Sequence, residues 1–311
     1  MKTRLLSSVI ALAATACLVR AADAPSQAPK RILFFSKSSG YEHSIIKDPA
    51  KAPPAEPGGP VPGLAFTVIK QIGAKNNIEF VFSKDGSLFS PAYLAGFDAY
   101  FFVTTGDLTT VGTDGNPAMS AAGKQALLDA VAAGKGFIGV HCASDTFHSP
   151  GGAKDRSPAR YVNDGDNADP YIRMLGGEFI IHGKQQKSHL IVADAKFPGI
   201  EGVPGDNDMV EEWYSMKNFA PNLHVLLVQQ TQGMTGIEYA RPNYPSTWVR
   251  TYGKGRVFYS NLGHRDDVWN GALFQSVLVG GLNWALGRVD ADVTPNLAEA
   301  APQASVLPPA P

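Results

Sequence analysis

Apolar residues in the first half of the chain occur in short continuous runs that end in small or polar residues. The runs are residues 31–36, 78–82, 97–103 and 137–140. Unbroken runs of this length are typical of parallel strands that are buried on both faces of a sheet. Residues 65–72 and 116–131 instead repeat their apolar positions with a helical period, so this half predicts strands that alternate with helices.

The second half of the chain predicts more strands and one closing helix. The predicted strands are residues 188–192, 223–229, 245–250 and 256–260, of which the last two form a hairpin. An apolar stripe over residues 269–286 predicts the final helix. Residues 149–169, which are rich in Gly, Pro and Asp, predict a lid or a binding loop. The two halves together predict one α/β domain with a mostly parallel sheet and helices on both faces.

Both ends of the chain lack the pattern of a folded domain. Residues 1–21 carry basic residues, an apolar run and small residues around a cleavage point, which predicts a signal peptide and a periplasmic or secreted protein. Residues 22–29 predict a linker, and residues 288–311, rich in Ala and Pro, predict a disordered tail. The folded domain is therefore expected over residues 30–287, and the mature protein is expected to have no membrane span.

The composition narrows the possible partners. The formal net charge is −1, and 44% of the residues are hydrophobic, so the chain can form a large core and has no charge excess for binding nucleic acid. No Gly-x-Gly-x-x-Gly follows the first strand and no Walker sequence is present, so a nucleotide cofactor is not expected. Cys17 leaves with the signal peptide, which leaves Cys142 without a partner for an internal disulfide.

The predicted strand at residues 137–140 stops at His141, and small and polar residues follow. A tight strand-to-helix turn at this point lifts a side chain above the end of the sheet, where α/β folds bind their ligands. Asp145 and His148 follow four and seven positions later, and they share one face with His141 if the turn continues as a helix. The alternative is a packed histidine with Asp145 as a helix cap. We expect a functional site here.

Three more histidines lie in polar loops that are expected at the same edge of the sheet or beside it. They are His43, His182 and His264. Because the carboxyl ends of parallel strands meet at one edge, we expect these rings to converge with His141, with Glu212 as an acidic companion. Acid–base chemistry without a cofactor is the first expectation, since no two of these histidines have the short spacing of metal ligands. Zinc bound by the four histidines is the alternative.

Aromatic residues flank the same loops. Tyr41, Trp213 and Tyr214 are the examples nearest to the candidate polar residues. Flat rings with a polar tip suit the apolar faces of sugars, which makes these residues candidates for substrate binding. The alternative interpretation is that the rings simply pack in the core.

Four segments of the chain are similar to segments of one known family. They are Gly-Tyr-Glu-His-Ser at residues 40–44, Gly-Val-His-Cys-Ala-Ser-Asp at 139–145, Gly-Arg-Val-Phe-Tyr-Ser-Asn-Leu-Gly-His at 255–264 and Gly-Leu-Asn-Trp-Ala at 281–285. Together they resemble the ThuA-like (trehalose utilisation) proteins over about residues 30–287. The resemblance implies a fold like that of class I glutamine amidotransferases, a flavodoxin-like sheet with an added β-ribbon.

The resemblance also implies a function in carbohydrate metabolism. Amidotransferases carry a nucleophilic cysteine in a Gly-x-Cys-x-Gly turn, but here His141 occupies that position and Cys142 comes one residue later, so glutaminase activity is not expected. We expect isomerisation, elimination or hydrolysis of a sugar or 3-keto-sugar. The expected catalytic residues are His141 and His264, oriented by Asp145 or Glu212. The expected substrate-binding residues are His43, Tyr41, His182, Trp213, Tyr214 and His148. The alternative is a non-catalytic carbohydrate-binding protein on the same fold.

Overall fold

The computed structural model describes residues 28–52, 59–150, 157–204 and 207–310. The predicted signal peptide at residues 1–21 and most of the predicted linker at residues 22–29 lie outside the described residues. No helix in the described part of the chain has the length and hydropathy that a membrane span requires.

A nine-stranded sheet runs through the described part of the chain in the order β2-β1-β3-β4-β11-β10-β9-β6-β7. Five strands form its parallel part: β1 (Lys30–Phe35), β2 (Ile78–Ser83), β3 (Ala99–Phe102), β4 (Gly136–Val140) and β11 (Gly255–Ser260). Four of these strands match the continuous apolar runs of the first half, and every residue of β3 and β4 is buried, as such runs predict.

The other strands of the sheet pair antiparallel. They are β10 (Tyr244–Tyr252), β9 (His224–Gln229), β6 (Gln186–Val192) and β7 (Asp208–Glu211). The predicted hairpin is confirmed as β10 and β11, joined by a tight turn in which Gly253 has a positive φ of 58°. A separate antiparallel ribbon consists of β5 (Glu178–His182) and β8 (Tyr214–Lys217). The predicted α/β class is confirmed, and the sheet is mixed.

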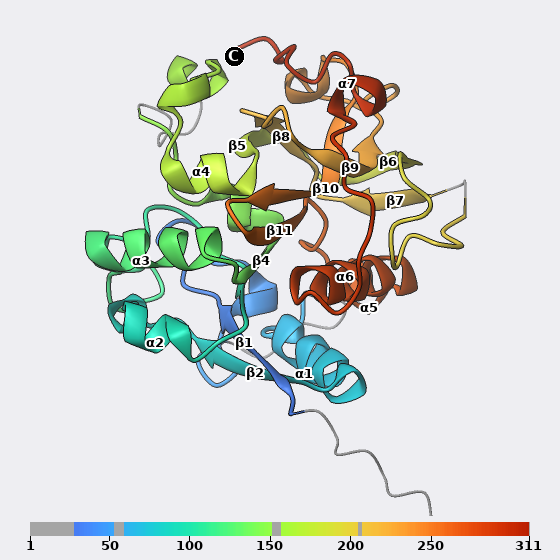
Figure 1. Cartoon of the computed structure of the whole chain (residues 1–311). Coiled ribbons are helices and arrows are strands. Elements are labelled where there is room, and N and C mark those ends of the chain that lie inside the picture. The colour runs from blue at the N-terminus through green and yellow to red at the C-terminus, as the bar shows by residue number, and fades with distance from the viewer. Residues whose placement is uncertain (1–27, 53–58, 151–156, 205–206, 311) are drawn as a thin grey trace, which may run out of the picture.

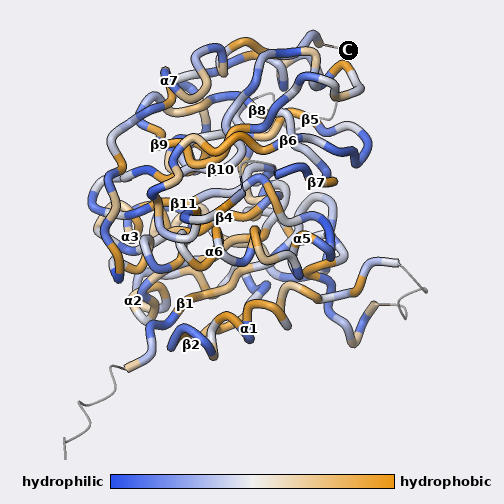
Figure 2. The backbone as a smooth tube through the Cα atoms, turned by 90° about the vertical axis from the view of Figure 1, so that its right-hand side faces the viewer, coloured by the Kyte–Doolittle hydropathy of each residue, from blue (hydrophilic) through white to orange (hydrophobic). Residues whose placement is uncertain are grey.

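Helices cover both faces of the sheet (Figure 1). One face carries α1 (Leu64–Asn76), α5 (Asp266–Asn270) and α6 (Ala272–Ala285), and the other carries α2 (Pro91–Ala95), α3 (Ala121–Ala132) and α4 (Pro170–Leu175). The short 3₁₀ helices are η1 (Ser44–Ile46), η2 (Gly86–Leu88), η3 (His141–Asp145), η4 (Pro158–Tyr161), η5 (Gly165–Asn167) and η6 (Ile237–Tyr239). Figure 2 shows hydrophobic stretches along β4, β10 and α1, where the sheet packs against its helices.

Two predicted helix boundaries are wrong, each for a local reason. The helix expected from residue 116 begins at Ala121, because the Ser120 hydroxyl accepts a hydrogen bond from Gly123 N at 2.9 Å and caps it. The helix expected over residues 269–286 is divided into α5 and α6, since Gly271 takes an extended conformation between them.

The C-terminal segment is ordered, so the prediction of a disordered tail over residues 288–311 is wrong for the part described. Asn296 exchanges two side-chain hydrogen bonds with the backbone of Val225, of 2.6 and 3.0 Å. Further along, past the short helix α7 (Leu297–Ala300), Ala304 accepts a hydrogen bond from Arg241 and is buried beside Tyr244. The tail contacts the first residues of β9, which precede the part of β9 that pairs with β6. Contacts of this extended kind need no sequence periodicity.

Candidate functional site

His141 lies in the turn directly after β4, with its backbone in the left-handed region at a φ of 48°. This conformation is unfavourable for a residue other than glycine and must be held by its surroundings. The Tyr259 and Ser144 hydroxyls both donate to the His141 carbonyl oxygen, at 2.8 and 3.2 Å. The ring is fully buried, and its Nδ1 lies 2.9 Å from the carbonyl oxygen of Asn261. The tight turn predicted from the sequence is therefore present.

The helix that was expected after this turn ends early. The 3₁₀ helix η3 stops at Asp145, and Thr146 is extended. As a result, the condition under which His148 would share a helical face with His141 is not met. Asp145 bonds to His148 instead, so it is not the residue that orients His141.

Three of the predicted histidines and one glutamate come together at the carboxyl edge of the parallel strands. His43 follows β1, His141 follows β4, His264 follows β11, and Glu212 follows β7. One ligand-type atom of each of these four residues lies within 4.8 Å of the others. We call this set the histidine–glutamate cluster. The chain thus brings together residues separated by more than 200 positions in the sequence.

Glu212 is the centre of the histidine–glutamate cluster. Its Oε2 lies 3.0 Å from His264 Nδ1, 3.4 Å from His141 Nε2 and 3.9 Å from His43 Nε2. Its other oxygen, Oε1, lies 3.4 Å from Nδ1 of His182, whose side chain is 42% exposed at the rim. His182 is therefore a neighbour of the cluster and not a member of it.

Burial and the carboxylate have opposite effects on the imidazoles. Burial lowers the pKa of His141 to about 4, although Glu212 acts in the other direction, and it also lowers the pKa of His43. Burial opposes protonation of His264 as well, but there the attraction of Glu212 is stronger and the pKa is raised. Burial alone would raise the pKa of Glu212, yet the three imidazoles hold it well below its usual value. His43 and His141 are thus neutral at pH 7.

Three buried ring nitrogens of the cluster have no hydrogen-bond partner in the described part of the chain. They are His43 Nδ1, His141 Nε2 and His264 Nδ1, the last of which lies near Glu212 but outside hydrogen-bonding geometry. His141 Nδ1 faces a carbonyl oxygen and so carries the proton, which leaves a lone pair on Nε2 pointing toward a carboxylate oxygen. Two electron-rich atoms facing each other in a buried site favour a cation between them.

The spacing of the histidine–glutamate cluster fits a metal ion. Imidazole nitrogens and carboxylate oxygens bind zinc at about 2.0–2.2 Å, so two ligands of a tetrahedral ion lie about 3.3 Å apart. The three distances from Glu212 Oε2 to the imidazole nitrogens, 3.0, 3.4 and 3.9 Å, bracket that value. The donor set also suits other divalent transition metals.

Three members of the histidine–glutamate cluster, His43, Glu212 and His264, line a pocket of about 950 Å³, whereas His141 is fully buried and is not among the lining residues. Aromatic rings form part of its wall: Tyr214 packs against the His141 ring with centroids 4.1 Å apart, and it stacks on His182 at 5.8 Å. Phe179 packs on the same tyrosine at 4.2 Å. Tyr41 is 69% exposed at the rim, edge-on to His43. A pocket of this size with rings beside polar groups suits a small polar ligand.

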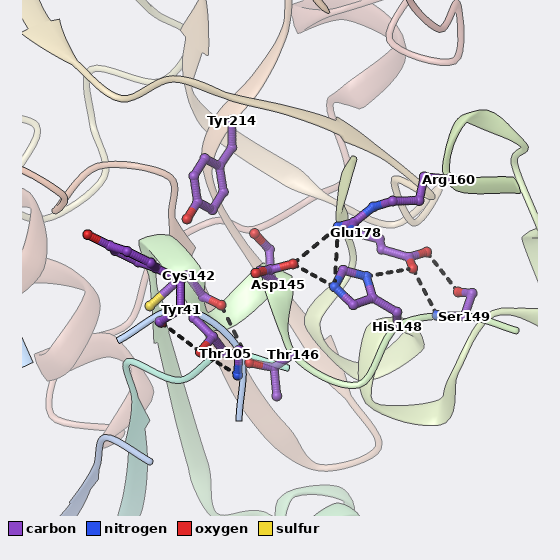
Figure 3. Close-up of polar contacts among 12 residues, drawn as sticks. Tyr41, Thr105, Cys142, Asp145, Thr146, His148, Ser149, Arg160, Glu178 and Tyr214 are labelled. Carbon is purple, nitrogen blue, oxygen red and sulfur yellow. Dashed lines mark hydrogen bonds and ion pairs between the residues drawn. The ribbon is translucent and has the colours of Figure 1, made fainter. Parts of the chain in front are cut away.

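A second polar group lines another part of the same pocket (Figure 3). His148 Nε2 lies 2.5 Å from Asp145 Oδ1, which also accepts from Arg160 Nη2 at 3.2 Å. His148 Nδ1 lies 3.4 Å from Glu178 Oε1. Sequence reasoning missed Arg160 and Glu178, because one lies in the irregular segment after β4 and the other begins the β5 strand, where neither has a recognisable motif.

Two residues near the turn and the ribbon point away from the pocket. Trp213 is fully buried and donates its Nε1–H to Gln186, so its predicted role in substrate binding is wrong. Neighbouring side chains in an extended segment point to opposite sides, which leaves Glu212 and Tyr214 on the pocket wall. Cys142 is also fully buried, and burial raises the pKa of its thiol. A thiol in this state is a poor nucleophile.

The matching family model is ThuA, described as trehalose utilisation, and it covers residues 63–285. The chain belongs to the ThuA family. The fold is similar to that of a ThuA-like protein from Bacteroides uniformis, with a TM-score of 0.57 and 16% identity over 84% of this chain and 93% of the other. A ThuA-like protein from Parabacteroides merdae is similar too, with a TM-score of 0.52 and 19% identity over 85% of this chain and 92% of the other.

A cytoplasmic protein from Salmonella typhimurium LT2 is also similar, with a TM-score of 0.52 and 16% identity over 84% of this chain and all of the other. At these identities the similarity concerns the fold. Comparison of the sequence with curated proteins gave no match. The ThuA membership that the four sequence segments predicted is therefore confirmed, together with a role related to carbohydrate use.

Proposed function

We propose that this ThuA protein binds a divalent transition metal at the histidine–glutamate cluster and carries out acid–base chemistry on a sugar that has a carbonyl group. The observation that carries the proposal is the convergence of three imidazoles on Glu212, with the buried Nε2 of His141 left without a hydrogen bond. This adopts the zinc alternative in place of chemistry without a cofactor, and Glu212 takes the ligand position that was expected for His182.

A bound divalent metal ion polarises a carbonyl oxygen and makes the neighbouring C–H bond more acidic. The chain itself provides the group that moves the proton. His182 Nδ1 lies 3.0 Å from the carbonyl oxygen of Gly183, so in the neutral ring the hydrogen is on Nδ1 and the lone pair is on Nε2. At the rim of the pocket this nitrogen is placed to take a proton from the ligand and exchange it with solvent.

The sugar substrate is supported by the family description and by the aromatic wall of the pocket. The order of the parallel strands, β2-β1-β3-β4-β11, matches the flavodoxin-like order and supports the proposed likeness to class I glutamine amidotransferases. Glutaminase activity is not part of the proposal, because a histidine takes the turn position and the adjacent Cys142 is buried.

The test begins with metal analysis of the purified protein and titration with zinc in the presence of a competing chelator. We expect one metal ion per chain, and we expect His141→Ala and His264→Ala each to lose it while remaining folded. His189→Ala is the matched control, since His189 pairs with Asp208 outside the pocket. Full occupancy in both cluster variants would show that the metal lies elsewhere.

Catalysis is tested by incubating the metal-loaded protein with a panel of sugars and 3-keto-sugars and following products by NMR. We expect turnover of a keto-sugar that stops on chelation and returns with zinc. Turnover that survives exhaustive chelation would support metal-free acid–base chemistry instead. Calorimetric binding with no product would support the non-catalytic carbohydrate-binding alternative.

A further inference from the structure

We propose that Asp145 is a substrate-binding carboxylate, whose Oδ2 accepts a hydrogen bond from a hydroxyl group of the bound sugar, and that His148 is its positioning residue. The inference rests on the proposed function and adds to it the group that recognises the sugar. It arises from the second polar group of the pocket, which the metal-based chemistry does not use.

The two oxygens of Asp145 have different surroundings. Oδ1 faces both His148 Nε2, at 2.5 Å, and Arg160 Nη2, at 3.2 Å. Oδ2 has no hydrogen-bond partner among the residues that the structure describes, and the side chain is 20% exposed on the pocket wall. One edge of the carboxylate is thus fixed, and the other is presented to the pocket. A carboxylate held in this way is a ready acceptor for a hydroxyl group.

His148 is held from both sides. Its Nε2 faces Asp145 and also lies 3.3 Å from Arg160 Nη2, and its Nδ1 faces Glu178 Oε1 at 3.4 Å, so each ring nitrogen meets a carboxylate oxygen. Ser149 N and Oγ donate to Glu178 at 2.8 and 2.7 Å, and Asn218 donates to it at 2.7 Å. His148 is therefore held in a fixed position, and burial of its ring is outweighed by the two carboxylates, which raise its pKa.

His148 and Arg160 keep Asp145 ionised. Burial would raise the pKa of this carboxylate, but His148 and Arg160 together lower it. An ionised carboxylate offers only acceptors, which suits a hydroxyl group and opposes an anion. Fixed geometry further favours binding, because little conformational entropy is lost when the ligand arrives.

The remaining charges of the pocket strengthen this preference for an uncharged ligand. Lys124 Nζ is paired with Asp169 at 2.6 Å, as Arg160 is with Asp145, so neither lysine nor arginine of the described pocket wall offers an uncompensated charge. Asp107 adds another carboxylate to the wall. Away from the histidine–glutamate cluster, the pocket therefore suits a neutral polyhydroxylated ligand and not a phosphorylated one.

The experiment compares two probes by calorimetry on the zinc-loaded protein: methyl 3-oxo-α-D-glucopyranoside and its 6-phosphate. We expect the neutral sugar to bind at least about 10-fold more tightly. Asp145→Asn should weaken binding of the neutral sugar by about 10-fold or more, since a hydrogen bond to a charged group is lost. The substitution should also reduce the difference in affinity between the neutral sugar and its 6-phosphate, because a negative charge has been removed.

Two further sets of variants separate recognition from structure. Asp194→Asn is the matched control, because Asp194 pairs with Nε2 of His224 at 3.0 Å in a similarly buried position outside the pocket, and it should leave binding unchanged. His148→Gln, which can still donate to Asp145, should retain more affinity for the neutral sugar than His148→Ala at equal metal content. Circular dichroism checks that each variant is folded.

Tighter binding of the phosphate by the wild-type protein would overturn this inference and leave the proposed function in place. Unchanged affinity in folded Asp145→Asn would also overturn it. If neither probe binds to protein that holds zinc, the carbohydrate function fails and the inference fails with it.

Discussion

Glu178, the most buried carboxylate of the second polar group, offers a quantitative test of how much that group contributes to folding stability. Its side chain is only 1% exposed, and Lys217, whose side chain is fully buried, lies 3.7 Å away. Burial by itself raises the pKa of Glu178, but His148, Lys217 and Ser149 outweigh it and lower the value to about 2 from 4.5. At about 1.4 kcal/mol for each pH unit, this corresponds to about 3 kcal/mol of folding free energy at neutral pH.

The sign of the pH dependence follows from the lowered pKa. A carboxylate with a lower pKa in the folded state contributes its stability above about pH 4.5 and loses it as the pH falls toward 2. Glu178→Gln keeps the shape of the side chain but cannot ionise. The variant should therefore be about 3 kcal/mol less stable than the wild type at pH 7, and the difference should narrow to about 1 to 1.5 kcal/mol at pH 3.

Urea unfolding followed by tryptophan fluorescence gives the free energies, since all four tryptophans are buried. Glu79→Gln is the matched control. Because its partner Arg31 is exposed, the loss of unfolding free energy should stay below about 1 kcal/mol at either pH. If Glu178→Gln lowered the free energy of unfolding equally at pH 7 and pH 3, the reasoning would be refuted, because the destabilisation would then come from packing and not from charge.

Four further predictions concern other parts of the chain. Cys142→Ser should leave any activity nearly intact, whereas a loss of several orders of magnitude would identify a nucleophile. Glu211 is fully buried and accepts hydrogen bonds from two backbone N–H groups of the loop before α5, so Glu211→Gln should lower zinc affinity by about 10- to 100-fold in a chelator competition; unchanged affinity would contradict this. Asn296→Ala should lower the free energy of unfolding, measured in urea, by about 2 kcal/mol, because two hydrogen bonds to Val225 are lost; if the tail were disordered, this free energy would not change. Mass spectrometry of protein from the native cells should find a chain that begins near Ala22, and an intact chain would rule out cleavage.

The parallel part of the fold could be predicted because its pattern is local. Unbroken apolar runs mark buried strands, and the ends of such strands meet at one edge. That rule alone predicts that His43, His141 and His264 come together. The same rule does not fix the position of Glu212 at the centre of the cluster, because Glu212 lies between β7 and β8, whose pairing is not encoded by a local pattern.

Two members of the second polar group, Arg160 and Glu178, could not be predicted for the same reason. Arg160 reaches Asp145 from η4, a short turn in an irregular segment, and Glu178 reaches His148 from the edge of a ribbon. Their contacts depend on how the two segments pack on η3. The sequence also allowed a helix in which Asp145 and His148 would share a face with His141, but the turn is a 3₁₀ helix that ends at Asp145, and Thr146 is extended.

The turn at His141 separates the geometry of the site from its chemistry. The left-handed backbone is held through the carbonyl oxygen of His141 by the hydroxyls of Tyr259 and Ser144, and neither contact depends on which side chain the turn carries. The turn would therefore keep its shape with a different side chain at this position. What the imidazole does is then decided by its neighbours. The neighbour that faces its free nitrogen is Glu212, which comes from outside the parallel part of the sheet. The strands outside the parallel part of the sheet thus supply the carboxylate that faces a turn provided by the parallel part itself.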